Sequence, residues 1–267
     1  MPMKSMKIEG AINNSIACVY FTQTFRNDSE SPIECVYKFP TDPSFAVSGL
    51  HVEMGDKHID AEVMEKKEAE EKYDDAVAGG HTAVKLSKDN KLPDIIELNI
   101  GAMQPSSEVK IRIKILSELE VMNNGFYTYV FPIEFIPRYG DSTGGIYGQG
   151  GFLTPTGIDL QFNINANSVI TNLNVSHKGM KCIQTEDGQS VSIRFNSKHP
   201  IDAKDIVISY SSEQIREPQL CVYKSEKYPG KLAAHISFIP RSSDECGYEG
   251  KHIVRYIFIN IIVLTSF

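Results

Sequence analysis

The sequence predicts a mainly β protein with one helical insert and a second β unit behind the first. Three observations predict this fold class. Short runs in which apolar and polar residues alternate recur along the chain. Turn-forming Gly, Pro, Asn and Asp residues separate these runs. One stretch, residues 64–78, has instead the spacing of an amphipathic helix. Many short strands at close spacing with a single helix favour a β-sandwich with a helical insert.

The first predicted strands lie on either side of a polar turn. Alternating apolar residues predict one strand over residues 17–25 and a second over residues 33–39. Residues 26–32 supply turn chemistry between them. Pro40 and Pro43 end the second strand, because proline cannot donate to a strand ladder. The most economical arrangement is an antiparallel pair joined by a short loop.

Two further strands and the helix follow. Residues 47–52 and 57–63 predict short strands around the turn Met54-Gly55-Asp56. The helix is predicted over Met64 to Ala78, and Gly79-Gly80 is a natural stop, since glycine tolerates the left-handed conformation. The residues on its apolar stripe are Ala69, Tyr73, Ala76 and Val77.

The rest of the first half returns to strands, predicted over residues 96–100, 109–115 and 126–131. The middle one is the most regular, with isoleucine and valine on one face and Lys110, Arg112 and Lys114 on the other. A basic outer face suits either solvent or a sheet edge.

The second half predicts a second all-β unit after a linker. Residues 140–151 are rich in glycine, but Phe152 follows where a phosphate-binding loop needs Lys-Ser or Lys-Thr. This composition therefore indicates a flexible linker. Alternation then predicts strands over residues 160–164, 191–195, 206–210, 220–224 and 232–238.

Composition narrows the class of protein. The 267 residues carry a formal net charge of −7, and no basic run exceeds two residues, so a nucleic-acid binder is not expected. Residues 1–15 contain no apolar core of a signal peptide. The cysteines are odd in number, which argues against a disulfide framework and favours a reducing, cytoplasmic location. They are Cys18, Cys35, Cys182, Cys221 and Cys246. Glycosylation triplets beginning at Asn13, Asn27 and Asn174 are interpreted as chance matches.

The sequence predicts no catalytic, cofactor-binding or metal-binding residues. No two histidines stand four residues apart, and none has cysteines at zinc spacing. The histidines are His51, His58, His81, His177, His199, His235 and His252. The run Asp42-Pro43-Ser44-Phe45-Ala46 lacks the second serine of an Asp-x-Ser-x-Ser magnesium loop. Asp74 and Asp75 are adjacent on the predicted helix and point apart, so they form a poor acid–base pair.

The order of these elements over residues 6–139 resembles the VIT (vault protein inter-alpha-trypsin) domain. The segments that carry the resemblance are Gln23-Thr24-Phe25, the Glu34–Pro40 strand, Glu65–Ala69 leading to Tyr73-Asp74-Asp75-Ala76, Asn99-Ile100-Gly101 and Pro137-Arg138-Tyr139. Within the family, the chain is most similar to intracellular proteins that pair a VIT domain with a von Willebrand A domain. The secreted inter-alpha-trypsin heavy chains are less similar, because they carry signal peptides.

The resemblance implies a domain organisation. It predicts a VIT domain over residues 6–139, a linker over 140–157 and a hybrid-like β segment over 158–240. In the family, a von Willebrand A domain is inserted into that last segment, so here it is expected to be incomplete. Residues 241–267 are then either the truncated start of a von Willebrand A domain or an aberrant carboxyl terminus. Their apolar run, Ile257–Leu264, is too short to span a bilayer.

The resemblance also implies a function without catalysis. The expected role is that of a protein-interaction or scaffold module with unidentified protein partners, taken from the amino-terminal part of a VIT–von Willebrand A protein. Two alternatives stay open. One is the non-catalytic part of a vault-type ADP-ribosyltransferase-like enzyme. The other is a secreted, matrix-binding protein similar to the inter-alpha-trypsin heavy chains.

Overall fold

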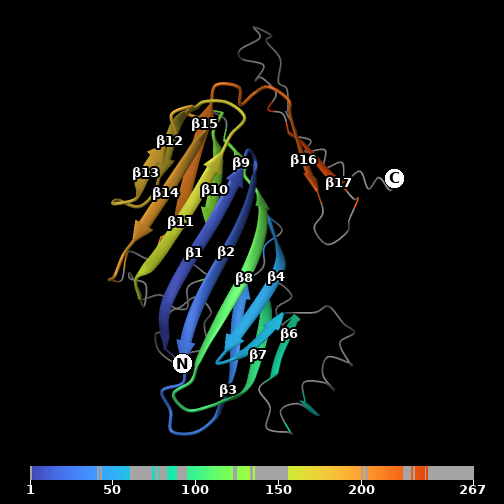
Figure 1. Cartoon of the computed structure of the whole chain (residues 1–267), viewed down its shortest axis with the longest axis vertical. Helices are drawn as coiled ribbons and strands as arrows, with labels where there is room; N and C mark the ends of the chain where they lie inside the picture. Colours follow the sequence, from blue (N-terminus) through green and yellow to red (C-terminus); the bar gives the residue numbers. More distant parts are fainter. Residues whose placement is uncertain are drawn as a thin grey trace, which may run out of the picture.

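The computed structural model describes residues 2–60, 74–75, 78, 83–88, 95–135, 156–224, 230 and 232–239, except 41, 43, 123–124, 133–134, 200, 202–203 and 238. Most of the described residues are in strands (Figure 1), as predicted. The strands are β1 (Met3–Asn13), β2 (Ile16–Arg26), β3 (Ile33–Pro40), β4 (Phe45–Met54), β5 (Lys57–Asp60), β6 (Ala83–Lys88), β7 (Ile95–Met103), β8 (Glu108–Glu118), β9 (Glu120–Val121), β10 (Tyr127–Phe131), β11 (Ile158–Asn165), β12 (Ile170–Val175), β13 (Lys181–Gln184), β14 (Ser190–Asn196), β15 (Ile206–Ser212), β16 (Gln219–Lys224) and β17 (Leu232–Ser237).

One long sheet organises the molecule. Its strand order is β13-β14-β11-β1-β2-β8-β4-β5 (Figure 1). All neighbours in it are antiparallel except β1 and β11, which run parallel with Met6 opposite Ile158 and Asn13 opposite Asn165. Because β1 and β11 pair directly, strands from both predicted units belong to the same sheet. The predicted boundaries between units stay a prediction.

Two smaller sheets cover one face of the long sheet. The sheet β3-β7-β6 lies over one end and the sheet β12-β15-β10-β9 over the other (Figure 1). Alternate side chains of β2 contact both: the Phe25 ring lies 5.8 Å from Tyr37, and the Phe21 ring lies 5.8 Å from Phe131. The apolar side chains of β2 that point inward are all buried, as the period of two requires.

The structure corrects one predicted pairing. Strands β2 and β3 were expected to form an antiparallel pair, but β2 pairs with β1 and β8 while β3 pairs with β7 in the other sheet. The reason lies at Asn27, whose side-chain amide donates to the main-chain oxygens of Ser31 and Met103. These hydrogen bonds hold the connecting segment as a crossing from one sheet to the other, instead of a hairpin.

The basic strand β8 faces solvent, but it is not at an edge. It lies between β2 and β4 in the middle of the long sheet. Lys110 and Arg112 are on its open face, while Ile111 and Ile113 are buried on the other. The alternation therefore predicts the faces correctly, and the edge interpretation is wrong.

Several predicted segments fall outside the described residues. Asp74, Asp75 and Ala78 are helical, but the rest of the predicted helix over 64–78 lies outside them. The same holds for nearly all of the glycine-rich linker and for residues 241–267. Within the described part of the chain, no helix is long and apolar enough to cross a membrane.

Candidate functional site

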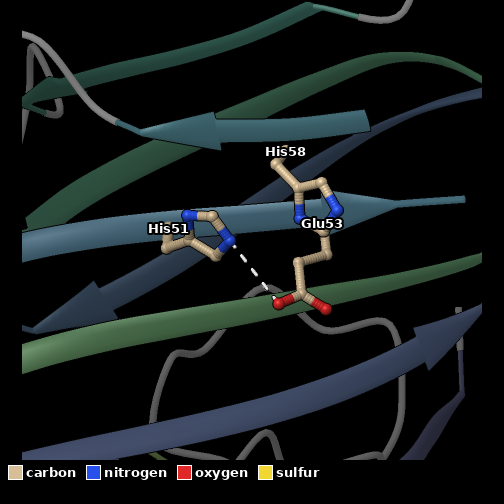
Figure 2. A group of neighbouring side chains, drawn as sticks. All are labelled: His51, Glu53 and His58. Carbon is tan, nitrogen blue, oxygen red and sulfur yellow. Dashed lines mark ion pairs between the residues drawn. The ribbon is translucent and has the colours of Figure 1, made fainter. Parts of the chain in front are cut away.

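Two features of the surface can carry function, and the first is a group of side chains on the β4–β5 hairpin. His51 and Glu53 are two residues apart on β4, so they share a face. On β5, His58 is directly opposite Glu53 and Asp60 is opposite His51. Figure 2 shows the side chains of His51, Glu53 and His58 gathered on the same side of the hairpin. One ligand atom from each of these three lies within 4.8 Å of the other two.

The contacts of this group are those of a compact polar cluster. His51 Nε2 lies 3.5 Å from Glu53 Oε1, the contact that is dashed in Figure 2. The other ring nitrogen, Nδ1, is 2.7 Å from Asp60 Oδ1. The His51 and His58 rings are stacked, with their centroids 5.7 Å apart. The two-residue spacing on β4 and the cross-strand pairing with β5 therefore hold two imidazoles and a carboxylate together.

Basic residues of β8 border the cluster. Lys110 is opposite Glu53, and its ammonium is 3.3 Å from Glu53 Oε2. This hydrogen bond is the largest influence that lowers the pKa of the Glu53 carboxyl, which favours the ionised form. Arg112 is opposite His51, but its guanidinium lies over the Tyr20 ring of β2, 4.4 Å from the centroid. Arg112 is thus directed away from the hairpin.

The sequence predicted no metal ligands at this cluster, because its histidines have neither the four-residue spacing of a helix face nor cysteine companions. In a hairpin, the signal is a ligand type at every second position on both sides of a turn, here His51-x-Glu53 and His58-x-Asp60 around Gly55. Gly55 has φ 56°, which allows the tight turn that brings the two pairs together. Among the described residues, no other group of three such side chains meets.

The other candidates from the sequence stay apart. Asp42 accepts a hydrogen bond from the Ser44 amide at 2.8 Å and closes a local turn, and its bonds to Ser44 lower the pKa of its carboxyl. Asn27 is 1% exposed, and its amide nitrogen already donates to main-chain oxygens, so a glycan cannot be attached there. His81 and His252 lie outside the described residues.

The second feature is the two-stranded ribbon β16–β17, which lies beside the long sheet (Figure 1). Its register places Leu220 opposite Ile236 and Val222 opposite Ala234 on one face. Leu220 is 60% exposed and Val222 55% exposed. We refer to the side chains of Leu220, Val222, Ala234 and Ile236 as the ribbon face.

On the opposite side of the ribbon, Gln219, His235 and Ser237 are buried and Cys221 is half-buried. Gln219 and Ser237 pair there, as do Cys221 and His235. The Cys221 thiol accepts a hydrogen bond from the Asn14 amide at 3.1 Å. The ribbon therefore reverses the usual pattern, since its polar side packs against the body while its apolar side faces out. A contiguous exposed apolar face of this kind typically marks a surface that another element covers.

Comparison with protein families identifies the first part of the chain. The model of the vault protein inter-alpha-trypsin domain matches residues 3–115. Residues 3–115 form a VIT domain. It includes β1–β7 and most of β8, so the His51 cluster belongs to it, whereas the ribbon β16–β17 lies beyond it.

Curated relatives extend the likeness past the VIT domain. The chain is 26% identical over 271 residues to von Willebrand factor A domain-containing protein 5A of Mus musculus, covering 92% of this chain and 34% of that protein. It is 28% identical to a von Willebrand factor A domain-containing protein of Dictyostelium discoideum, covering 89% and 24%. The chain thus spans about a third or less of these relatives.

A second kind of relative shares the VIT region over a shorter length. Human protein mono-ADP-ribosyltransferase PARP4 is 37% identical over 122 residues, which covers 46% of this chain and 7% of that protein.

Among solved structures, one described as a nutrient binding protein from Legionella pneumophila has a TM-score of 0.48 at 11% identity, covering 80% of this chain and 68% of that chain. A likeness at this level bears on neither fold nor function.

Proposed function

We propose that the chain is a non-catalytic protein-interaction module whose ribbon face docks onto a von Willebrand A domain. The ribbon face carries this proposal, because apolar side chains on a two-stranded ribbon gain stability only when something covers them. Its polar inner side already packs against the VIT domain through Asn14 and Cys221. The outward side is therefore the one available to a partner.

The relatives support the choice of partner. Those that match about nine tenths of this chain are named for a von Willebrand A domain, and the match uses about a third of their length. The ribbon also contains the last two strands of the described chain. Together these observations favour a von Willebrand A domain over an unrelated protein.

A binding measurement tests this function. The purified chain is titrated with the isolated von Willebrand A domain of a relative, and association is followed by analytical ultracentrifugation. Leu220→Lys and Val222→Lys are expected to abolish the complex, because each buries a charge in the interface. The matched control is Ile183→Lys, which changes an exposed apolar residue of β13 that lies outside the ribbon face.

Two results would contradict the proposal. If the ribbon variants bind as well as the unchanged chain does, the ribbon face is not the docking surface. If instead the chain forms a dimer by itself and Leu220→Lys dissociates it, a second copy covers the ribbon face in place of a von Willebrand A domain.

The second candidate function is that of the non-catalytic part of an ADP-ribosyltransferase-like enzyme. Its support is the 37% identity to PARP4. That likeness covers 46% of the chain, while the von Willebrand relative covers 92%, so the first candidate accounts for more of the sequence. Binding of the purified chain to the isolated catalytic domain of an ADP-ribosyltransferase, without binding to a von Willebrand A domain, would decide for the second.

We also propose a reducing, cytoplasmic location. Cys18, Cys182 and Cys221 form no disulfide in the part of the chain that the structure describes, which suits such a compartment. Cell fractionation with a cytosolic marker tests this location, and recovery of the protein from the culture medium would contradict it.

A further inference from the structure

We propose that the β4–β5 hairpin binds one zinc ion through His51, Glu53 and His58, with Asp60 positioning His51. The proposal begins with the hydrogen of the His51 ring. The Asp60 carboxylate can only accept a hydrogen bond, so Nδ1 of His51, 2.7 Å away, carries the hydrogen. In the neutral ring, Nε2 then presents a lone pair toward Glu53.

Two acceptors then face each other. Nε2 of His51 and Oε1 of Glu53 are 3.5 Å apart, and neither has a hydrogen to share while the ring is neutral. A cation between them resolves this conflict, either as a proton on Nε2 or as a metal ion. A carboxylate that orients the far nitrogen of a histidine is the usual arrangement around a zinc-bound imidazole.

The spacing fits zinc. Bonds of about 2.1 Å to nitrogen and oxygen place tetrahedral ligands about 3.4 Å apart. The His51–Glu53 distance of 3.5 Å matches this value, and the His58 ligand atom lies within 4.8 Å of both. A rotation of the exposed His58 side chain closes the remaining gap. Imidazole ligands favour zinc over calcium and magnesium, which prefer oxygen alone.

The neighbouring charges allow a cation. Lys110 contacts Oε2 of Glu53, which leaves Oε1 for the metal. Its effect on the pKa of Glu53 also favours the carboxylate form that a metal requires. Arg112 lies over Tyr20, and its Nη2 is 4.0 Å from Glu9, so its charge is drawn toward β1 and β2. Three protein ligands leave a fourth position, which faces solvent and water can fill.

Calorimetric titration of the full chain with zinc chloride, with its thiols reduced, tests the proposal. We expect saturable binding of one zinc ion per chain. His51→Asn and His58→Asn should each abolish it, while the control His199→Asn, at an exposed histidine outside the hairpin, should retain it. Binding should weaken as pH falls, because protons compete with zinc for His51 and His58, whose charged neighbours are Glu53, Asp60, Lys110 and Arg112.

Asp60→Ala separates positioning from structure. If Asp60 positions His51, its removal should lower the affinity for zinc by at least about tenfold. The melting temperature in a chelating buffer should stay unchanged, because Asp60 is at the exposed end of β5. Imidazole resonances of His51 and His58 should shift on zinc addition, and those of His199 should not.

Other results would overturn the proposal. These are the absence of zinc binding, binding that survives both histidine substitutions, and binding that is lost in Cys182→Ser but kept in His58→Asn. The NMR measurement on the unchanged chain decides the question even if a variant fails to fold.

Discussion

The Tyr37 hydroxyl donates a hydrogen bond to the side-chain oxygen of Gln23 inside the core, where β2 of the long sheet meets β3 of a smaller one. The Gln23 side-chain nitrogen donates to the main-chain oxygen of Phe135 at 2.8 Å, just past β10. Gln23 therefore binds the two covering layers to the long sheet at the point where they adjoin. This position has a polar residue in an otherwise apolar row because a main-chain oxygen and a buried hydroxyl both need partners there.

Gln23→Ala is expected to destabilise the fold by about 3 kcal/mol. The substitution leaves the Tyr37 hydroxyl and the Phe135 oxygen buried without partners, and each such group costs about 1–3 kcal/mol. Urea denaturation measures the change. The control is Gln161→Ala, on the exposed side of β11, which should change stability by less than about 0.5 kcal/mol. Equal effects of the two substitutions would mean that the buried hydrogen bonds contribute nothing.

A double-mutant cycle tests the Gln23–Tyr37 bond directly. Tyr37→Phe removes the donor and leaves the ring in place. The sum of the two single losses should exceed the loss in the double variant by about 1 kcal/mol, since residues in direct contact are coupled. Additive losses would show that the two side chains act independently.

Gly10→Ala is expected to destabilise the β1–β11 pairing by roughly 2 kcal/mol. A methyl group at Gly10 would lie 2.1 Å from Cε1 of the buried Phe162 ring, and overpacking of this kind costs about 1–3 kcal/mol. Gly49→Ala is the matched control, because its nearest neighbour is the Lys114 Cβ at 3.4 Å, close to ordinary contact. Thermal unfolding of both variants compares them.

Phe162→Leu should partly rescue Gly10→Ala, because the smaller side chain leaves room for the methyl group. If Gly10→Ala costs the same stability in the chain with Phe162 as in the chain with leucine at position 162, the Phe162 ring does not lie close to Gly10.

Gly10 also explains why the sequence did not predict β1. Its inward positions are Ile8, Gly10 and Ile12, so glycine interrupts the apolar alternation where Phe162 of β11 fills the space. Alternation within a strand predicts which side chains are buried, and it does so correctly for β2, β8 and β11. It carries no information about partners far along the chain, so neither the parallel β1–β11 pair nor the separation of β2 from β3 could be predicted.

Asn14→Ala is expected to cost about 1 kcal/mol more than Asn14→Gly. Asn14 has φ 51° in the turn between β1 and β2, a conformation that glycine accepts and alanine resists. Both substitutions remove the side-chain bonds to Cys221 and to the Asn167 amide, so their difference reports the backbone alone. Chemical denaturation of the two variants measures it. Greater stability of the alanine variant would rule out the left-handed turn.

Lys110→Met is expected to raise the pKa of Glu53 toward its ordinary value of 4.5, because the main influence that lowers it is removed. A carboxyl NMR titration of Glu53 in chelating buffer measures the shift.

The same change in pKa predicts how stability depends on pH. A carboxyl whose pKa is lower in the folded than in the unfolded chain stabilises the fold at pH values above its unfolded pKa, and this contribution is lost as pH falls through its folded pKa. The Lys110→Met penalty, at most about 1 kcal/mol for so exposed a pair, should therefore be present at neutral pH and vanish in acid. Lys181→Met, on β13 at the other edge of the long sheet, is the control and should leave the Glu53 titration unchanged. A Glu53 titration that is the same with and without Lys110 would show that the two side chains do not interact in solution.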